Sequence, residues 1–428
     1  MSVEQIHHKY GIPSFDGSQI DQTQNRLDVQ HYTRAPLPGF DSLKFKLAYT
    51  DYQHQEQTVD GNPATQFYNR SVDARIDLAH PAWAGWHGTV GAQAGESHFS
   101  ATDLTNPGHA AIIPPTDSRT AALFAVESRS WGPLTWDWGT RFDNVARTPD
   151  GSVPYTDTAS FTTPGAPEAQ NRSFDLWSWS TGLLWAFDRE HSAGLTYAVA
   201  QRAPATEELY SFGAHDATVT FDVGNSSLQA ETAHNLELSV QRTAGLVQWR
   251  ANVFENQVSN YIYGTYPGTV DATTGYQVRQ FVQADATLRG AEAELTYNWH
   301  QPGYSSRLFF DTARGTLDAG GNLPLQAATR LGVEGAYAHG AWRSSLSVTH
   351  ALQQTQLASF ETDPTPEYTQ VDAAWSLRDR FMGQEVTWYL QGRNLLNEDI
   401  RYSTTVEALR LYAPQMGRSL ILGARFAL

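Results

Sequence analysis

Hydrophobic and polar positions alternate along this chain with a period of two residues. In the segment 177–187, Trp177, Trp179 and Leu183 fall on one face, while Ser178 and Ser180 fall on the other. Because successive side chains of a strand point to opposite faces, this pattern predicts strands with one apolar and one polar face. The same alternation recurs in residues 247–253, 370–377 and 419–428. Helical periodicity is almost absent, so the sequence predicts an all-β protein.

About 17 segments carry the strand pattern. They cover residues 18–33, 42–52, 64–79, 86–100, 117–129, 133–146, 171–187, 190–201, 229–243, 246–264, 276–299, 304–316, 327–338, 341–353, 366–379, 384–395 and 414–428.

The links between these segments alternate in length. Short, turn-like links occur at residues 130–133, 188–190, 243–245, 300–303 and 338–340. Long polar links cover residues 101–116, 147–170, 202–228, 265–275, 317–326, 354–365 and 396–413. Outer-membrane β-barrels have brief periplasmic turns and extended outer loops. The pattern therefore predicts an antiparallel transmembrane β-barrel whose long loops lie outside the cell.

The predicted barrel occupies residues 18–428, and residues 1–17 are expected to be the end of an extracellular loop. Bacterial single-chain barrels have an even number of strands, whereas about 17 are predicted here. The terminal strand, which alternates up to Leu428, also needs a neighbour on its second edge because lipid cannot satisfy open backbone groups. We therefore expect this sequence to be the C-terminal part of a larger barrel.

Aromatic and charged residues refine this prediction. Aromatic residues make up 12% of the chain, and tryptophans stand at strand ends, as in the interfacial belts of membrane proteins. Platforms for stacking sugars are the alternative for these tryptophans. Arg250, Arg393 and Arg425 fall on the more polar faces of their strands. We expect them to face the lumen, because a lipid-facing arginine at mid-bilayer costs roughly 2–4 kcal/mol.

Composition also excludes several functions. The formal net charge is −16, which argues against a nucleic-acid partner. Cysteine is absent, so disulfides and thiolate sites are excluded. No run of 18 apolar residues predicts a membrane helix, and the start of the sequence has no pattern of an export signal. Nucleophile elbows, zinc-hydrolase motifs and phosphate-binding loops do not occur, so we expect neither an enzyme nor a bound cofactor.

Three motifs resemble those of a known family. The first consists of residues 201–210 followed by 223–237, and the other two are residues 290–294 (Gly-Ala-Glu-Ala-Glu) and 392–397 (Gly-Arg-Asn-Leu-Leu-Asn). All three are similar to barrel signatures of TonB-dependent outer-membrane receptors. In the N-terminal half, residues 10–13 (Tyr-Gly-Ile-Pro) resemble the branch that includes zinc-uptake receptors. Residues 14–18 carry no histidine and depart from the histidine-rich loop of that branch.

The resemblance implies a 22-stranded barrel with a plugged lumen. It also implies a receptor in the outer membrane that binds a scarce nutrient, such as a metal ion, siderophore or haem. The inner-membrane TonB complex would then act on the plug to admit that nutrient. The sequence lacks the family's N-terminal plug, its coupling box and about five strands. We therefore expect a barrel fragment whose contact with the TonB complex requires a plug that this sequence does not contain.

Candidate ligand residues lie in the long links. His109 lies in the first, and Glu207, Tyr210, His215 and Asp216 lie together in the link 202–228. Imidazole and carboxylate groups together suit zinc or iron, and nearby aromatic rings suit haem or a siderophore. The alternative is that these are ordinary loop residues exposed to solvent.

Two other classes of protein remain open from the sequence. The chain could be a passive or structural outer-membrane barrel, such as a porin, without energy coupling. It could also be a soluble, aromatic-rich β protein that binds carbohydrate.

Overall fold

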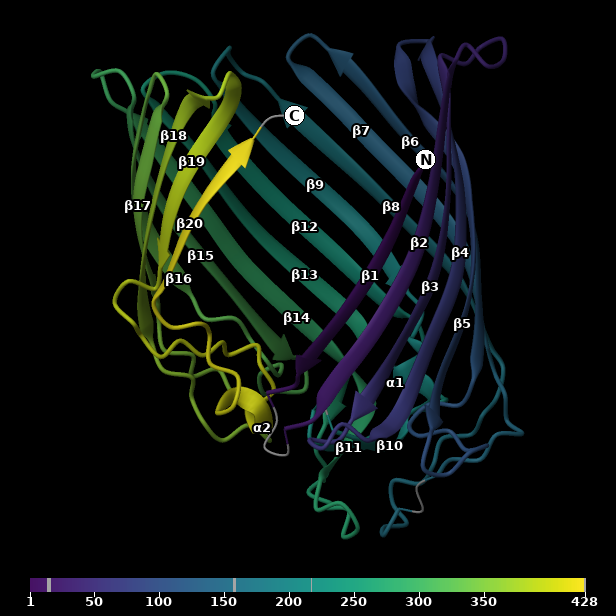
Figure 1. Cartoon of the computed structure of the whole chain (residues 1–428). Coiled ribbons are helices and arrows are strands. Elements are labelled where there is room, and N and C mark those ends of the chain that lie inside the picture. The colour runs from purple at the N-terminus through teal and green to yellow at the C-terminus, as the bar shows by residue number, and fades with distance from the viewer. Residues whose placement is uncertain (14–16, 157–158, 217, 427–428) are drawn as a thin grey trace. The chain divides into compact units, whose positions relative to one another are not determined.

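The computed structural model describes residues 1–13, 17–156, 159–216 and 218–426. In this part of the chain there are 20 strands and two short helices (Figure 1). Neither of these two helices is long and apolar enough to cross a membrane.

The elements follow one another in this order: β1 Ser2–Gly11, β2 Gln19–Arg34, β3 Ser42–Gln57, β4 Pro63–Trp83, β5 Trp86–Asp103, β6 Thr116–Trp131, β7 Leu134–Pro149, β8 Arg172–Trp185, β9 His191–Arg202, α1 Thr206–Tyr210, β10 Phe212–His215, β11 Thr220–Val223, β12 Glu231–Arg242, β13 Val247–Thr265, β14 Gln277–Asn298, β15 Tyr304–Leu317, β16 Arg330–His339, β17 Trp342–Ala351, β18 Tyr368–Phe381, β19 Gln384–Arg393, α2 Glu407–Arg410 and β20 Ser419–Phe426.

Each predicted strand has a counterpart, and β1, β10 and β11 are additional. Residues 1–17 were expected to form the end of a loop, but they include β1, which pairs with β2 from Ser2↔Asp28 to Gly11↔Gln19. The argument from an odd number of strands therefore does not hold. The predicted loop included residues 14–16, and the predicted terminal alternation included Ala427 and Leu428. These positions lie outside the described residues.

The chain divides into two compact units. Unit 1 comprises Met1–Leu183, Tyr197–Asn235 and Gln257–Ala286. Unit 2 comprises Leu184–Thr196, Leu236–Asn256 and Thr287–Leu428.

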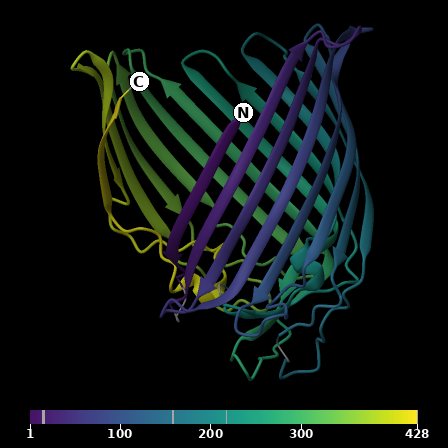
Figure 2. The ribbon, with the colours of Figure 1, turned by 45° about the vertical axis from the view of Figure 1, so that its right-hand side comes forward.

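In unit 1, strands β1 to β7 pair with their neighbours in chain order, and every pairing is antiparallel (Figure 2). The link between β4 and β5 is a two-residue turn in which Ala84 and Gly85 have φ angles of 51° and 84°. Positive φ at both positions is the geometry that matches the twist of a tight hairpin, and glycine adopts it without steric cost. In unit 1 the link between β6 and β7, at the same end, is also short, whereas the links at the opposite end, from β5 to β6 and from β7 to β8, are long.

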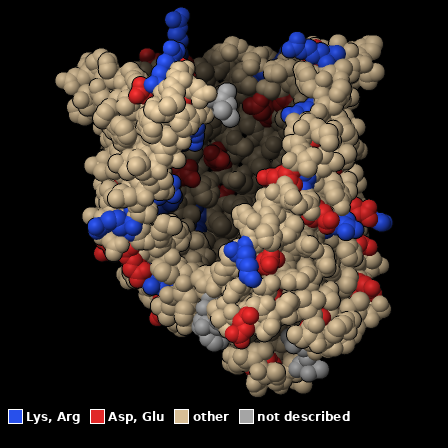
Figure 3. All heavy atoms as spheres, in the orientation of Figure 1, with Lys and Arg blue, Asp and Glu red and all other residues tan. Residues whose placement is uncertain are grey.

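In unit 2, strands β15 to β20 form a second series of antiparallel pairs. The terminal strand keeps its predicted alternation, with Leu420 and Leu422 70% and 77% exposed on one face. On the other face, Ser419 lies opposite Arg393, and Arg425 lies opposite Thr387. Arg393 and Arg425 therefore share the polar face of the sheet, as predicted. The surface seen in Figure 3 is largely uncharged, and many of its acidic and basic side chains lie next to one another.

Buried apolar side chains form a compact core at the long-link end of unit 1. The short strands β10 and β11 form an antiparallel hairpin, and β11 pairs in parallel with β14 from Thr220↔Gln277 to Val223↔Gln280. Phe212, Phe221, Val223 and Val278 form a buried cluster there. Beside it, the helix α1 buries Leu209 and Tyr210. This end of the unit is thus a packed structure built from several links.

Candidate functional site

The long-link end of unit 1 holds the five predicted ligand residues, four of them in α1 and the β10–β11 hairpin and His109 in the link between β5 and β6. We call α1, the β10–β11 hairpin and the links around residues 150–171 and 266–276 the loop cluster. Its helix starts at a fixed point because the backbone N–H of Ala205 donates to Oε2 of Glu208 over 2.7 Å. The same carboxylate accepts a hydrogen bond from Arg202, which also binds Glu231. These contacts connect α1 to the start of β12.

A buried carboxylate lies at the centre of the hairpin. Asp222 accepts hydrogen bonds from Nε of Arg279 over 2.9 Å and from the Thr220 hydroxyl over 2.7 Å. Nδ1 of His215 lies 3.2 Å from the same carboxylate. The sequence reasoning missed Asp222 and Arg279, because the parallel pairing of β11 with β14 brings them together across more than 50 positions of the chain. An acidic and a basic residue inside two apolar strand segments were the available signal.

The charges in this hairpin perturb one another. Burial lowers the pKa of His215, but the hydrogen bond and the negative charge of Asp222 outweigh it and leave the pKa above its ordinary value. Glu56 raises this pKa further, and Arg279 opposes the increase. Burial raises the pKa of Asp222, yet His215 and Arg279 hold it below its ordinary value. Both groups are therefore stabilised in their charged forms.

The other candidates are held by hydrogen bonds within the cluster. The buried Tyr210 donates its hydroxyl to the carbonyl of Gln170 over 2.8 Å, and burial raises its pKa to about 12. Asp216 accepts from the Tyr276 hydroxyl over 2.9 Å. The carbonyl of Glu207 accepts from the Ser211 hydroxyl over 2.6 Å. These contacts are sufficient to explain the residues as parts of the packed loops.

His109 differs from these residues. Its Nδ1 atom is buried and has no hydrogen-bond partner within the described part of the chain. Among the described residues, no group of three or more His, Cys, Asp or Glu side chains is placed to hold a metal ion. The structure thus brings His215 and Asp216 into one hairpin but does not assemble the five candidates into a ligand sphere.

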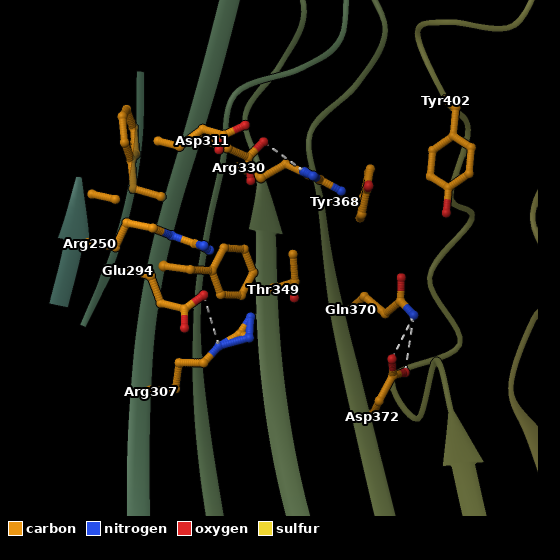
Figure 4. A pocket seen from close by; sticks show the side chains of 14 residues that line it. Arg250, Glu294, Arg307, Asp311, Arg330, Thr349, Tyr368, Gln370, Asp372 and Tyr402 are labelled. Atoms are coloured by element: carbon orange, nitrogen blue, oxygen red, sulfur yellow. Dashed lines mark hydrogen bonds and ion pairs between the residues drawn. The ribbon is translucent and has the colours of Figure 1, made fainter. Parts of the chain in front are cut away.

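A second candidate region lies on the polar face of unit 2. Six charged side chains from four strands form what we call the charged wall: Arg250 on β13, Glu292 and Glu294 on β14, Arg307 and Asp311 on β15, and Arg330 on β16. They line a hollow of about 470 Å³ (Figure 4). Arg250 had been predicted to face the polar side, and it does so here.

Ion pairs tie part of the charged wall together. Nε of Arg330 lies 3.1 Å from Asp311, and Nε of Arg307 lies 3.8 Å from Glu294, as the dashed lines in Figure 4 show. Arg250 extends toward Glu294 in the same view but makes no ion pair within the described residues. Opposite charges that alternate across neighbouring strands stabilise a polar face without giving it one dominant sign.

The hollow continues toward the long links. A neighbouring hollow of about 310 Å³ shares Asp311, Arg330, Tyr368 and Tyr402 with the first. Tyr402 belongs to the link between β19 and β20, which was predicted to be an outer loop. The two hollows therefore form a continuous polar track from that link down the face of the sheet.

Long antiparallel strands, an exposed apolar face and a charged opposite face define the class of membrane β-barrels. The family described as "TonB dependent receptor-like, beta-barrel" matches residues 7–395. The chain belongs to this family, and the resemblance of the sequence motifs is confirmed. Barrels of this family lie in the outer membrane.

Solved structures show the same fold. The "Copper transporter OprC" matches with a TM-score of 0.79 and 13% identity, over 95% of this chain and 66% of that chain. The FrpB iron transporter from Neisseria meningitidis (F3-3 variant) gives a TM-score of 0.73 and 12% identity, over 99% and 68%. The Serratia marcescens hemophore receptor HasR, in complex with HasA and heme, gives 0.70 and 17%, over 99% and 68%. The chain thus spans about two thirds of the length of these proteins.

Proposed function

We propose that this chain forms the barrel of an energy-coupled receptor that takes up a scarce nutrient through the outer membrane. The observation that carries the proposal is the family match over residues 7–395. The nutrient class is a metal ion, a siderophore or haem. Support for this class comes from the matched structures, which include a copper transporter, an iron transporter and a receptor in complex with heme.

Different regions of this chain would have different roles in uptake. The apolar face would contact lipid, and the long links would meet the nutrient at the cell surface. The polar track along the charged wall would give a hydrated ligand a path with alternating charges, so that neither a cation nor an anion is trapped. In the whole protein, the TonB complex would act through a plug domain.

Uptake in cells tests this proposal. The full-length gene product is produced in cells with and without TonB, and entry of radioactive zinc, iron and haem is measured. We expect uptake of at least one of these only when TonB is present, because passage would require work on the plug. Equal uptake in both strains would contradict energy coupling and favour a passive barrel.

The five loop residues stay a prediction, and His109 is the sharpest test among them. Its Nδ1 atom is buried without a hydrogen-bond partner among the described residues, whereas the side chains of Tyr210, His215 and Asp216 make hydrogen bonds within the loop cluster. His109→Ala is expected to lower uptake several-fold by weakening the bound ligand. His8→Ala, which removes an exposed histidine of β1, is the matched control. Unchanged uptake in His109→Ala would remove His109 from the proposed site.

A further inference from the structure

Three tryptophan rings surround one arginine at the short-turn end of unit 1. The residues are Trp86, Trp131, Trp136 and Arg129. The ring centroid of Trp86 lies 6.0 Å from that of Trp131 and 5.0 Å from that of Trp136. The centroids of Trp131 and Trp136 lie 6.3 Å apart. The guanidinium carbon of Arg129 lies 4.7 Å from the Trp131 ring and 5.9 Å from the Trp86 ring. We call this group the tryptophan box.

Three neighbouring strands build the box. Arg129 on β6 pairs directly with Trp136 on β7, and Trp86 begins β5 on the other side of β6. The turn before Trp86 closes the space, since a Cβ added to Gly85 would lie 3.2 Å from Nε of Arg129. Figure 2 shows these strands among the adjacent strands of this unit. The arginine is therefore held against backbone and rings, with its charged end near the turns.

The box lies on the apolar face of the sheet. Side chains two positions apart on a strand share a face, so Arg129 and Trp131 lie on the face of Leu123. Leu123 is 66% exposed, and Phe142 on the adjacent strand is also exposed. On the opposite face, Phe124 stacks under the guanidinium groups of Arg75 and Arg141. The tryptophan box thus belongs to the face that the proposed function assigns to lipid.

Arg129 lacks the ion pair that several strand arginines make with a carboxylate two positions along the same strand. Arg75 pairs with Asp77 and Arg141 with Asp143 in this way. The corresponding carboxylate for Arg129 is Glu127. Its Oε1 instead lies 2.8 Å from Nε2 of His80, and the side chains of His80 and Glu127 are only 2% and 11% exposed.

No carboxylate of the described residues lies within ion-pair distance of Arg129. The second carboxylate oxygen of Glu127, Oε2, is buried without a hydrogen-bond partner, so it accepts no hydrogen bond from Arg129. A guanidinium on an apolar face without a counter-charge is costly unless an external anion meets it. The planar guanidinium of Arg129 can donate two parallel hydrogen bonds to the oxygens of a phosphate group.

We propose that the tryptophan box binds the phosphate of an anionic phospholipid headgroup, with Arg129 as the charged contact and the rings against the glycerol and upper acyl chains. The inference rests on the proposed insertion of the barrel in the outer membrane. Tryptophan rings prefer the headgroup level of a bilayer, and basic side chains there attract anionic lipids. The exposed apolar surface that continues from the box favours a lipid over a free phosphate ion or a protein partner.

Quenching of tryptophan fluorescence by brominated lipids tests the site. The protein is placed in phosphatidylcholine nanodiscs that contain a minor fraction of brominated phosphatidylglycerol or of brominated phosphatidylcholine. We expect phosphatidylglycerol to quench more strongly. Its apparent preference should be about fivefold, which corresponds to about 1 kcal/mol for one basic side chain at an anionic surface. Arg129→Gln should abolish the difference, and Arg129→Lys should keep part of it.

Arg119→Gln is the matched control. Arg119 lies on the same strand and face as Arg129 but is bound to Glu96, so its loss should leave the preference unchanged. Heat-modifiable migration in detergent shows that each variant is folded. Equal quenching by both lipids, a preference that survives Arg129→Gln, or loss of the preference with excess inorganic phosphate would overturn the proposal. Absence of quenching by either lipid would instead refute membrane insertion, and the headgroup site with it.

Discussion

Asp222 is the buried charge around which the loop cluster is organised. It accepts hydrogen bonds from Arg279 and Thr220 and lies beside His215, so three side chains depend on one carboxylate. Removing one partner of a buried pair costs more than the pair contributes, because the other charge is left without compensation. Residues of this hairpin therefore hold the links in place, whatever ligand the cluster meets.

The stability of the hairpin should depend on pH. The pKa of His215 is raised by folding, so its contribution is fully present below the ordinary value of 6.5 and is lost as the pH rises through the higher folded pKa. The pKa of Asp222 is lowered, so its contribution is present above the ordinary value of 3.8 and is lost as the pH falls through the folded pKa. The hairpin should be most stable between these two values.

Amide hydrogen exchange in residues 212–223, corrected for intrinsic rates, measures this dependence. We expect exchange to be several-fold slower at about pH 5.5 than at about pH 8.5, because raising the pH favours the neutral form of His215. His215→Gln should make the corrected rates nearly independent of pH in this range. A wild-type protein with the same rates at both values would contradict the role given to His215.

At the scale of single elements, β6 shows how one strand serves two environments. Leu123 is 66% exposed and Val126 is 54% exposed, yet the alternation of the strand places them on opposite faces. Leu123 shares the apolar face with the tryptophan box, whereas Val126 shares the face of Phe124, which lies under Arg75 and Arg141. Exposure alone does not distinguish these two positions, but the period of the strand does.

Arginine substitutions separate the two faces. Leu123→Arg should impair folding into phospholipid vesicles, because a lipid-facing arginine near the midplane costs roughly 2–4 kcal/mol. Val126→Arg should fold nearly as well as the wild type, because water and charged groups meet that face. Heat-modifiable migration after folding into vesicles measures both. If both variants fold equally well, the assignment of the apolar face to lipid is wrong.

The sequence predicted long strands well because their alternation is local. It missed β1, β10 and β11 because these segments carry no such pattern. β1 is almost entirely polar and exposed, and its ladder with β2 defines it as a strand. β10 and β11 have only four residues each, and their hydrogen bonds depend on partners brought near by the folding of distant links. The candidate site was also predicted only in part. The composition of the link 202–228 marked it as a site, but it did not single out Asp222 within that link or Arg279 outside it.

At the scale of the whole molecule, the charged wall connects the fold with the proposed transport. Arg330→Gln removes one side of the Arg330–Asp311 ion pair on the polar track and should lower nutrient uptake several-fold. Arg289→Gln is the control, because Arg289 pairs with Glu255 outside the track in the same unit. Uptake assays on the full-length protein compare the two. Equal effects of both substitutions would argue that the track has no part in passage.

The sequence by itself determined the class of the fold, the long strands, the division of their two faces and the family. These follow from a period of two residues and from short motifs, which are properties of neighbouring positions. The tertiary structure decided which side chains meet, because Asp222 with Arg279, Arg330 with Asp311, and Arg129 with Trp86 are contacts between strands. Register between strands fixes such contacts, and no single strand contains the information that sets it.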